Sequence, residues 1–151
     1  MNTLYKLVVM IHIFSAIIGL GPGFLLVYIV KKAGNMAELR HAYSIRRRLH
    51  TIVMAGGTLL LLTGLAMGAI RPYLFSAGWY LGALALFMMA LAMGPLVLAP
   101  RARKVKALLA SHKGDDIPPA YYSLSRNLFF YEHIESSLFL AIIALMIVKP
   151  F

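Results

Sequence analysis

The chain has 151 residues, of which 61% are hydrophobic and only 13% are charged. Soluble domains are about 45–50% apolar and about 25% charged, so this composition excludes an ordinary soluble domain. It also excludes a disordered chain, which requires low hydrophobicity. The chain has no cysteine, which excludes disulfides, thiolate metal sites and covalent c-type haem attachment. The formal net charge of +10 is typical either of nucleic-acid-binding proteins or of membrane proteins with basic cytoplasmic loops.

Four apolar runs are each long enough to cross a bilayer, which takes about 20 helical residues. These runs cover about 4–30, 49–70, 79–98 and 128–148. The first run is long and has no A-x-A-like cleavage site, so we expect it to stay as a membrane anchor. The sequence therefore predicts an all-α membrane protein with one domain, 1–151, folded as a four-transmembrane-helix bundle.

Turn-forming and capping residues predict where these spans end. The tripeptide at 33–35 ends the first span, and the Gly-, Asp- and Pro-rich run at 114–119 predicts a loop before the fourth. Ser44 is expected to cap an early start of the second span. Pro95 is expected to kink the third span and Pro100 to close it.

Basic residues are concentrated in two of the three connections. The connections between spans 1 and 2 and between spans 3 and 4 carry Lys31, Lys32, Arg40, Arg46, Arg47, Arg48, Arg101, Arg103, Lys104, Lys106, Lys113 and Arg126. The connection around Arg71 has one basic residue, and the termini add only Lys6 and Lys149. The positive-inside rule therefore places both long loops in the cytoplasm and both termini on the extracytoplasmic side. Topology accounts for the charge, and we expect no nucleic-acid partner.

Small residues recur along three of the spans. Gly19 and Gly23, and likewise Gly64 and Gly68, have G-x-x-x-G spacing, and the third span supplies Gly82, Ala90 and Gly94. Helices in lipid need such residues for close backbone approach, so packing is one interpretation. Room for a flat cofactor between helices is the other, because glycine lets a ligand approach the backbone.

Ionisable side chains inside the spans are few and usually mark a functional site. They are His12, His50, Glu132, His133 and Glu135. A lone membrane histidine is often only an interhelical hydrogen-bonding group, so each histidine has a structural alternative. Together the histidines predict haem b, because imidazole is the usual protein ligand of haem iron and bundles build cofactor sites on facing helices.

Depth in the bilayer separates the histidine pairs. At 1.5 Å per residue, His12, His133 and His50 lie about 12, 22 and 30 Å below the outer boundary. Two axial ligands of one haem need similar depths, which disfavours His12 with His50 and leaves two pairs, His50 with His133 and His12 with His133, each within about 10 Å in depth. We favour His50 with His133 near the cytoplasmic side, leaving His12 for a second site or as a lone ligand.

Further residues would complete such a site. Gly57 shares a helical face with His50 and would leave room for the ligand. Glu132 and Glu135 are expected to pair with arginines of the second span. The arginines that would meet haem propionates or these carboxylates are Arg46, Arg47 and Arg48.

Short segments of the chain resemble known families of membrane proteins. The segment MIHIFSAIIG at 10–19 resembles the first span of HemJ-type protoporphyrinogen oxidases and CopD-type copper-resistance proteins. The segment 47–65 resembles the second span of HemJ, and 147–151 resembles its C-terminus. Over nearly its full length, the chain looks still closer to an uncharacterised bacterial family of predicted four-span integral membrane proteins.

The resemblance implies a multi-pass protein of the bacterial inner membrane that holds b-type haem. His12 matches the first-span histidine of HemJ. HemJ also carries a lysine in its third span, as part of its proposed active site, and the matching stretch at 78–84 has none. Porphyrinogen oxidase activity is therefore not expected, whereas another haem-dependent oxidoreductase activity is compatible with the sequence.

The leading interpretation is a small haem-binding membrane protein with a redox or a haem- or porphyrin-handling role. It would work with a redox partner or a quinone, as a monomer or a homodimer. Transport of copper or another metal ion is an alternative, because thioether sulfur suits Cu(I). The methionines in question are Met54, Met67, Met88, Met89 and Met93. A non-catalytic partner subunit is the third interpretation.

Overall fold

The structure is a computed structural model that describes residues 3–150, and helices with no strand make up its regular structure over that range. The N-terminal half comprises α1 (Thr3–Leu20), the 3-10 helix η1 (Pro22–Leu25), α2 (Leu26–Lys31) and α3 (Met36–Ile70). The C-terminal half follows the 3-10 helix η2 (Pro72–Ser76) and comprises α4 (Gly78–Met93), the π-helix η3 (Gly94–Leu98), α5 (Ala99–Ser111) and α6 (Pro119–Val148). Phe151, in the C-terminal segment used for the resemblance, lies outside the described residues.

The expected four spans are confirmed. Helical stretches long and apolar enough to cross a membrane cover Thr3–Lys31, Met36–Ile70, Gly78–Ser111 and Pro119–Val148. The second and fourth begin well before the apolar runs at 49 and 128, and the third ends well after 98. Polar helical turns therefore extend the apolar runs at the end of the molecule that carries the basic connections.

Ser44 is not the cap of the second span, as we had expected. The helix begins at Met36, and Asn35 caps it by accepting a hydrogen bond from the Glu38 backbone N–H at 2.9 Å. The Glu38 carboxylate in turn accepts from the Gly34 backbone N–H at 2.8 Å. Asn35 thus satisfies one donor that the first helical turn leaves free, and Glu38 fixes the backbone just before the cap. Ser44 therefore lies inside the helix.

Pro100 does not close the third span either. The regular α-helix is interrupted at η3, which contains Pro95, as the sequence predicted. Pro100 then stands in the first turn of α5, directly after the π-helical turn and within one continuous helical stretch. The helix therefore runs on to Ser111.

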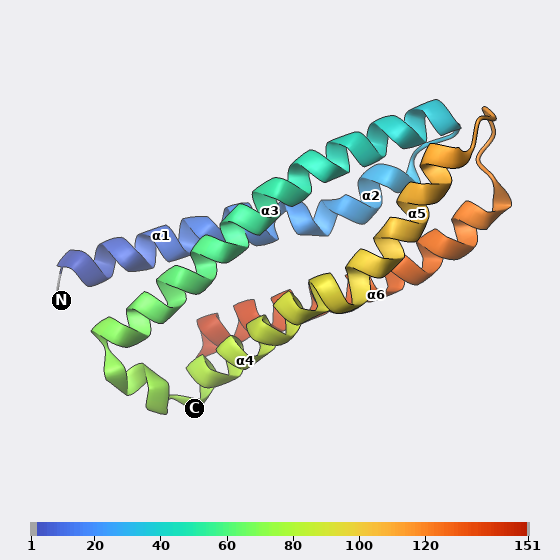
Figure 1. The fold of residues 1–151 in the computed structure, drawn as a ribbon. Helices are drawn as coiled ribbons and strands as arrows, with labels where there is room; N and C mark the ends of the chain where they lie inside the picture. The colour runs from blue at the N-terminus through green and yellow to red at the C-terminus, as the bar shows by residue number, and fades with distance from the viewer. Residues whose placement is uncertain (1–2, 151) are drawn as a thin grey trace.

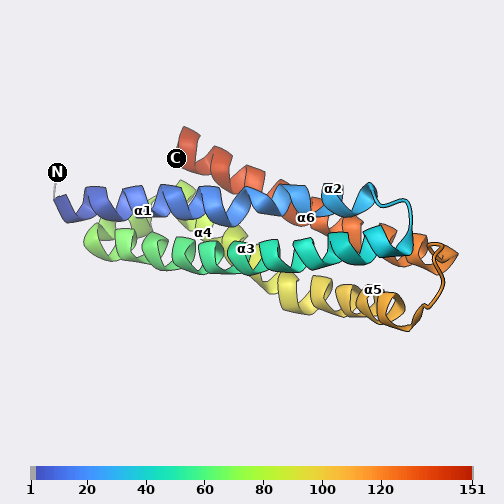
Figure 2. The same cartoon turned by 90° about the horizontal axis from the view of Figure 1, so that it is seen from above.

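The helices form two antiparallel hairpins. In the N-terminal hairpin (3–70), α1 and α2 pack along α3, and in the C-terminal hairpin (78–148), α4 and α5 pack along α6. Both chain ends lie at the same end of the elongated molecule, here called the termini end (Figures 1 and 2). The connections at 32–35 and 112–118 lie at the opposite end, here called the loop end.

Glycines set the closeness of α1 and α3. A Cβ on Gly56 would lie 2.5 Å from the Gly19 N and Cα atoms, and one on Gly19 would lie 2.8 Å from the Gly56 carbonyl carbon. Only glycine fits both positions, because backbone meets backbone there. Gly19 therefore has the packing role that its G-x-x-x-G spacing predicted.

Three apolar clusters join the two hairpins. The loop-end cluster contains Val27, Val30, Met36, Leu39, Ala42, Val105, Leu109, Tyr121, Leu128 and Phe129. The middle cluster contains Leu20, Leu60, Ala83, Phe87 and Ile142. The termini-end cluster contains Met67, Leu74 and Tyr80. The hairpins thus pack against each other at three places along their length, and a cavity remains between the loop-end and middle clusters.

Candidate functional site

A cavity of about 1050 Å³ lies between the hairpins. Its walls include Leu109 and Leu128 of the loop-end cluster and Leu20 and Phe87 of the middle cluster. Small-molecule and cofactor sites typically measure about 300–1000 Å³ and are mostly apolar with a few polar groups. The cavity has the size and the mainly apolar lining of such a site.

Small residues create part of this space. Gly19, Gly23, Gly57, Ala90 and Gly94 all line the cavity. A Cβ placed on Gly23, Gly57 or Gly94 would meet no atom within 4 Å. These three glycines therefore differ from Gly19, whose hydrogen faces the backbone of α3, and they widen the cavity rather than bring helices together.

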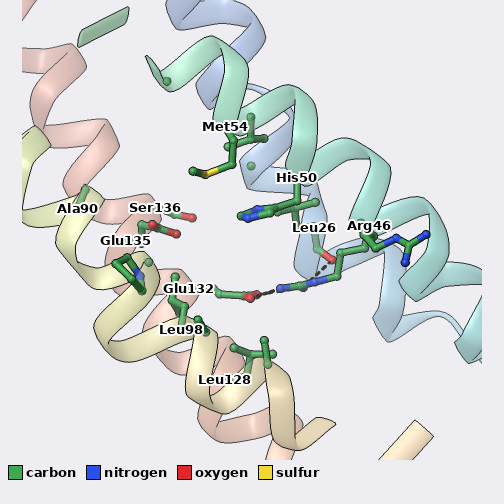
Figure 3. Close-up of a pocket in the computed structure, with 18 of the residues that line it drawn as sticks. Leu26, Arg46, His50, Met54, Ala90, Leu98, Leu128, Glu132, Glu135 and Ser136 are labelled. Atoms are coloured by element: carbon green, nitrogen blue, oxygen red, sulfur yellow. Dashed lines mark hydrogen bonds and ion pairs between the residues drawn. The ribbon is translucent and has the colours of Figure 1, made fainter. Parts of the chain in front are cut away.

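His50 is the histidine that lines this cavity within the described part of the chain. Figure 3 shows His50 and Met54 of α3 projecting from one hairpin toward Glu135 and Ser136 of α6 on the other. An imidazole and a carboxylate thus face the same space from opposite walls. Both groups exchange protons, and the imidazole is also a metal ligand.

An ion pair joins the hairpins at the loop-end side of the cavity. The Arg46 guanidinium donates to both carboxylate oxygens of Glu132, and its Nη1 also donates to the Leu26 carbonyl oxygen at 3.2 Å. Only 13% of the Arg46 side chain and 10% of the Glu132 side chain are exposed. The contact ties α2, α3 and α6 together, as Figure 3 shows, and confirms the expected pairing for Glu132. Glu135 forms no ion pair within residues 3–150.

More basic side chains line the cavity toward the loop end. They belong to Arg40, Arg47 and Lys106. Arg40 donates through Nε to the Leu109 carbonyl oxygen at 3.2 Å and through Nη2 to the His112 carbonyl oxygen. The cavity is therefore apolar through its middle and positively charged at one end, which suits a ligand with an apolar body and anionic groups.

The structure brings some of the predicted site residues together and separates others. His50, Arg47 and Gly57 line the cavity, whereas Arg48 does not. His133 does not line it either, because consecutive helical residues are about 100° apart and it is the neighbouring Glu132 that faces inward. The structure thus gives His50 and His133 no common cavity, and their pairing stays a prediction without structural support.

His12 lies elsewhere, between α1 and α3. Its Nδ1 is 2.9 Å from the Thr63 hydroxyl oxygen, and its ring lies 3.4 Å from where a Cβ on Gly64 would stand. Thr63 also donates to the Leu59 carbonyl oxygen at 2.7 Å. This is the interhelical hydrogen-bonding arrangement that offered a structural alternative for a membrane histidine.

Glu135 was predicted only as an ion-pair partner, and Ser136 was not singled out at all. Both lie on a face of α6 that lines the cavity together with Leu128, Glu132 and Phe139. These positions recur at helical spacing, so the sequence carried the signal. The neighbouring π-helix, η3, adds Gly94 and Pro95 to the same wall, and π-helical turns are frequent at functional sites.

The described residues do not form a multidentate metal site. No group of three or more histidine, cysteine or acidic residues could hold an ion within them. Four of the methionines considered for copper lie in different surroundings. Met54 lines the cavity, Met67 is buried in the termini-end cluster, and Met88 and Met89 are about half exposed.

Comparisons with known proteins agree with the membrane architecture. No curated protein and no solved structure matches the chain. Residues 6–150 match a protein family described as a predicted integral membrane protein, DUF2269. This match supports the resemblance to a multi-span membrane family and gives no support to the resemblance to HemJ-type or CopD-type proteins. Since the match covers nearly the whole chain, reaches into all four helical spans and includes the whole cavity lining, the chain belongs to the DUF2269 family of integral membrane proteins.

Proposed function

We propose that this protein binds one haem b, or a related porphyrin, in the cavity between its hairpins, with His50 as the protein ligand of the iron. The observation that carries the proposal is the position of His50 on the wall of an approximately 1050 Å³ apolar cavity. Imidazole is the usual protein ligand of haem iron, and helical bundles place such ligands on facing helices.

The residues present fit this group. Haem has a flat apolar ring and two carboxylates at one edge, and the cavity combines glycine-lined walls with a basic loop end. Arg47, Arg40 and Lys106 line that end and would meet the carboxylates. The positive-inside rule would place this basic end of the cavity on the cytoplasmic side of a bacterial inner membrane.

The donor set supports one histidine ligand rather than two. Neither His133 nor His12 lines the cavity, so the opposite wall would present Glu135 and Ser136 to the ligand. Haem, when bound, supplies redox or oxygen chemistry. The chain would contribute binding, orientation and exclusion of water, with the Arg46–Glu132 pair holding the hairpins together and Glu135 holding or releasing a proton beside the ligand.

An optical spectrum of the full-length protein, purified after expression with haem supply, tests the proposal. We expect a Soret band that is lost in His50→Ala and kept in His133→Ala, which removes a histidine of α6 that does not line the cavity. His12→Ala should also keep the band. A wild-type protein without a Soret band, or a band that survives His50→Ala but not His133→Ala, would overturn the assignment.

A further inference from the structure

A second pocket, of about 350 Å³, lies at the termini end. It is lined by Tyr5, Lys6, Val9, Arg71, Tyr73, Leu74, Trp79 and Lys149. These residues come from the start of α1, the end of α3, η2, the start of α4 and the end of α6. Both hairpins therefore contribute to this pocket, which shares no lining residue with the larger cavity that His50 lines.

This pocket gathers the basic residues of the termini end. Lys6, Arg71 and Lys149 are the lysines and arginines outside the two basic connections, and all three line the pocket. None of the carboxylate side chains lies there. Three of them (Glu38, Asp115, Asp116) belong to the loop end, and the other two (Glu132, Glu135) line the larger cavity. The charge of the small pocket is therefore positive and is not neutralised by the chain's own acidic residues.

Aromatic rings hold two of these cations in place. The Arg71 guanidinium lies 4.0 Å from the centre of the Tyr5 ring, and its Nη1 donates to the Tyr73 hydroxyl at 3.3 Å. The Lys149 ammonium lies 5.1 Å from the centre of the Trp79 ring. Cation–π contacts orient a cation without cancelling its charge, so the pocket stays able to attract an anion.

Helix dipoles explain only part of this arrangement. Arg71 and Lys149 cap the C-termini of α3 and α6, where a cation is favoured. Lys6 lies in the first turns of α1, near a helix N-terminus, where the dipole disfavours a cation. A shared anionic ligand accounts for all three positions.

The backbone conformation of Lys149 also supports an anionic ligand. Its φ is 47°, the one positive φ at a non-glycine residue in the described part of the chain. This left-handed cap position is usually taken by glycine, sometimes by asparagine. A lysine there gives up the preferred cap and places an ammonium group over Trp79.

We infer that this pocket binds an anion with phosphate chemistry, supplied either by the headgroup of an anionic phospholipid or by free phosphate. An arginine offers paired donors that match phosphate oxygens, and lysine adds point charges. Tryptophan and tyrosine favour the headgroup level of a bilayer, which is where a lipid phosphate lies. The inference is independent of haem binding.

Trp79 provides the readout, because it is the only tryptophan in the chain and lines the pocket. The full-length protein in neutral detergent would be titrated separately with phosphatidylglycerol, phosphatidylcholine and inorganic phosphate. We expect a saturable change in Trp79 emission with phosphatidylglycerol and none with phosphatidylcholine. A matching change with inorganic phosphate identifies the source as the free anion, and its absence identifies the lipid headgroup. Equal responses to both lipids, with none to phosphate, would overturn the inference.

Variants test the cations individually, with native mass spectrometry counting retained phosphatidylglycerol and bound phosphate. Lys149→Gly suits the left-handed backbone, so it should fold well and yet weaken anion retention at least tenfold. Arg71→Gln should weaken it similarly. The control Arg103→Gln removes an exposed cation of α5 and should retain the anion like the wild type. Wild-type retention in both Lys149→Gly and Arg71→Gln would refute the site.

Discussion

The crossing of α1 and α3 allows a sharp test with two adjacent glycines. Gly56→Ala places a Cβ 2.5 Å from the Gly19 backbone, whereas Gly57→Ala places one where no atom lies within 4 Å. The two variants add the same methyl group to the same helix, one position apart. Any gain in helix propensity is therefore common to both, about 1 kcal/mol.

The difference in unfolding free energy between these variants isolates the clash. Ordinary contact begins at 3.4 Å, so the backbones would have to separate by about 0.9 Å to accept the Gly56→Ala methyl group. Overpacking typically costs about 1–3 kcal/mol. Because neither backbone can rotate away as a side chain would, we expect a difference of about 3 kcal/mol, or more than about 100-fold in the unfolding equilibrium constant.

Equilibrium unfolding in mixed micelles of increasing SDS content, followed by far-UV circular dichroism, measures this difference. Gly57→Ala should match or exceed the wild type in stability and should weaken haem uptake, because its methyl group enters the cavity. Gly56→Ala should unfold at a clearly lower SDS fraction. Equal stability of the two variants would show that α1 and α3 do not approach as closely as the structure describes.

Three further contacts predict effects of graded size in the same unfolding assay. Glu132→Gln leaves the buried Arg46 charge without its partner and should lower the free energy of unfolding by about 3–5 kcal/mol. The apolar double replacement of Arg46→Met with Glu132→Leu should recover most of that stability. If it does not, the cause of the loss is not mainly electrostatic. Tyr80→Phe removes the hydroxyl that donates to an α3 carbonyl at 2.9 Å and should cost about 1 kcal/mol. Thr63→Val removes the hydrogen-bond partner of His12 and should cost about 0.6–2 kcal/mol without loss of the Soret band. A lost band would return His12 to the ligand set.

The spans could be predicted because a bilayer imposes length and apolarity directly on the sequence. Their ends could not be placed from apolarity alone, because polar helical turns beyond the bilayer depend on local capping. Asn35 and Glu38 carried a capping-box signal that decides the start of α3. Pro100 misled because the interruption of the regular α-helix falls at η3, and the helix continues through Pro100 to Ser111.

The candidate site was predictable where one helix face determined it, as for His50 and Gly57. Which face of a second helix opposes the first depends on tertiary packing, which span order and depth do not specify. Depth made His133 the best partner for His50, yet Glu132 faces the cavity and His133, about 100° further around α6, does not line it. The basic pocket was not predictable from spacing, because its residues come from five separate segments.

The connection at 71–77 is the short covalent link between the two hairpins, and the large cavity lies in the seam between them. A ligand that occupies the seam and binds only the docked arrangement acts as a thermodynamic cross-link between two halves of one chain. At a concentration 100 times its dissociation constant, it would add about 2.7 kcal/mol to the free energy of docking. The fraction of molecules with docked hairpins would then rise with the concentration of the ligand. The rate at which the protein is degraded in the membrane would fall as more ligand becomes available.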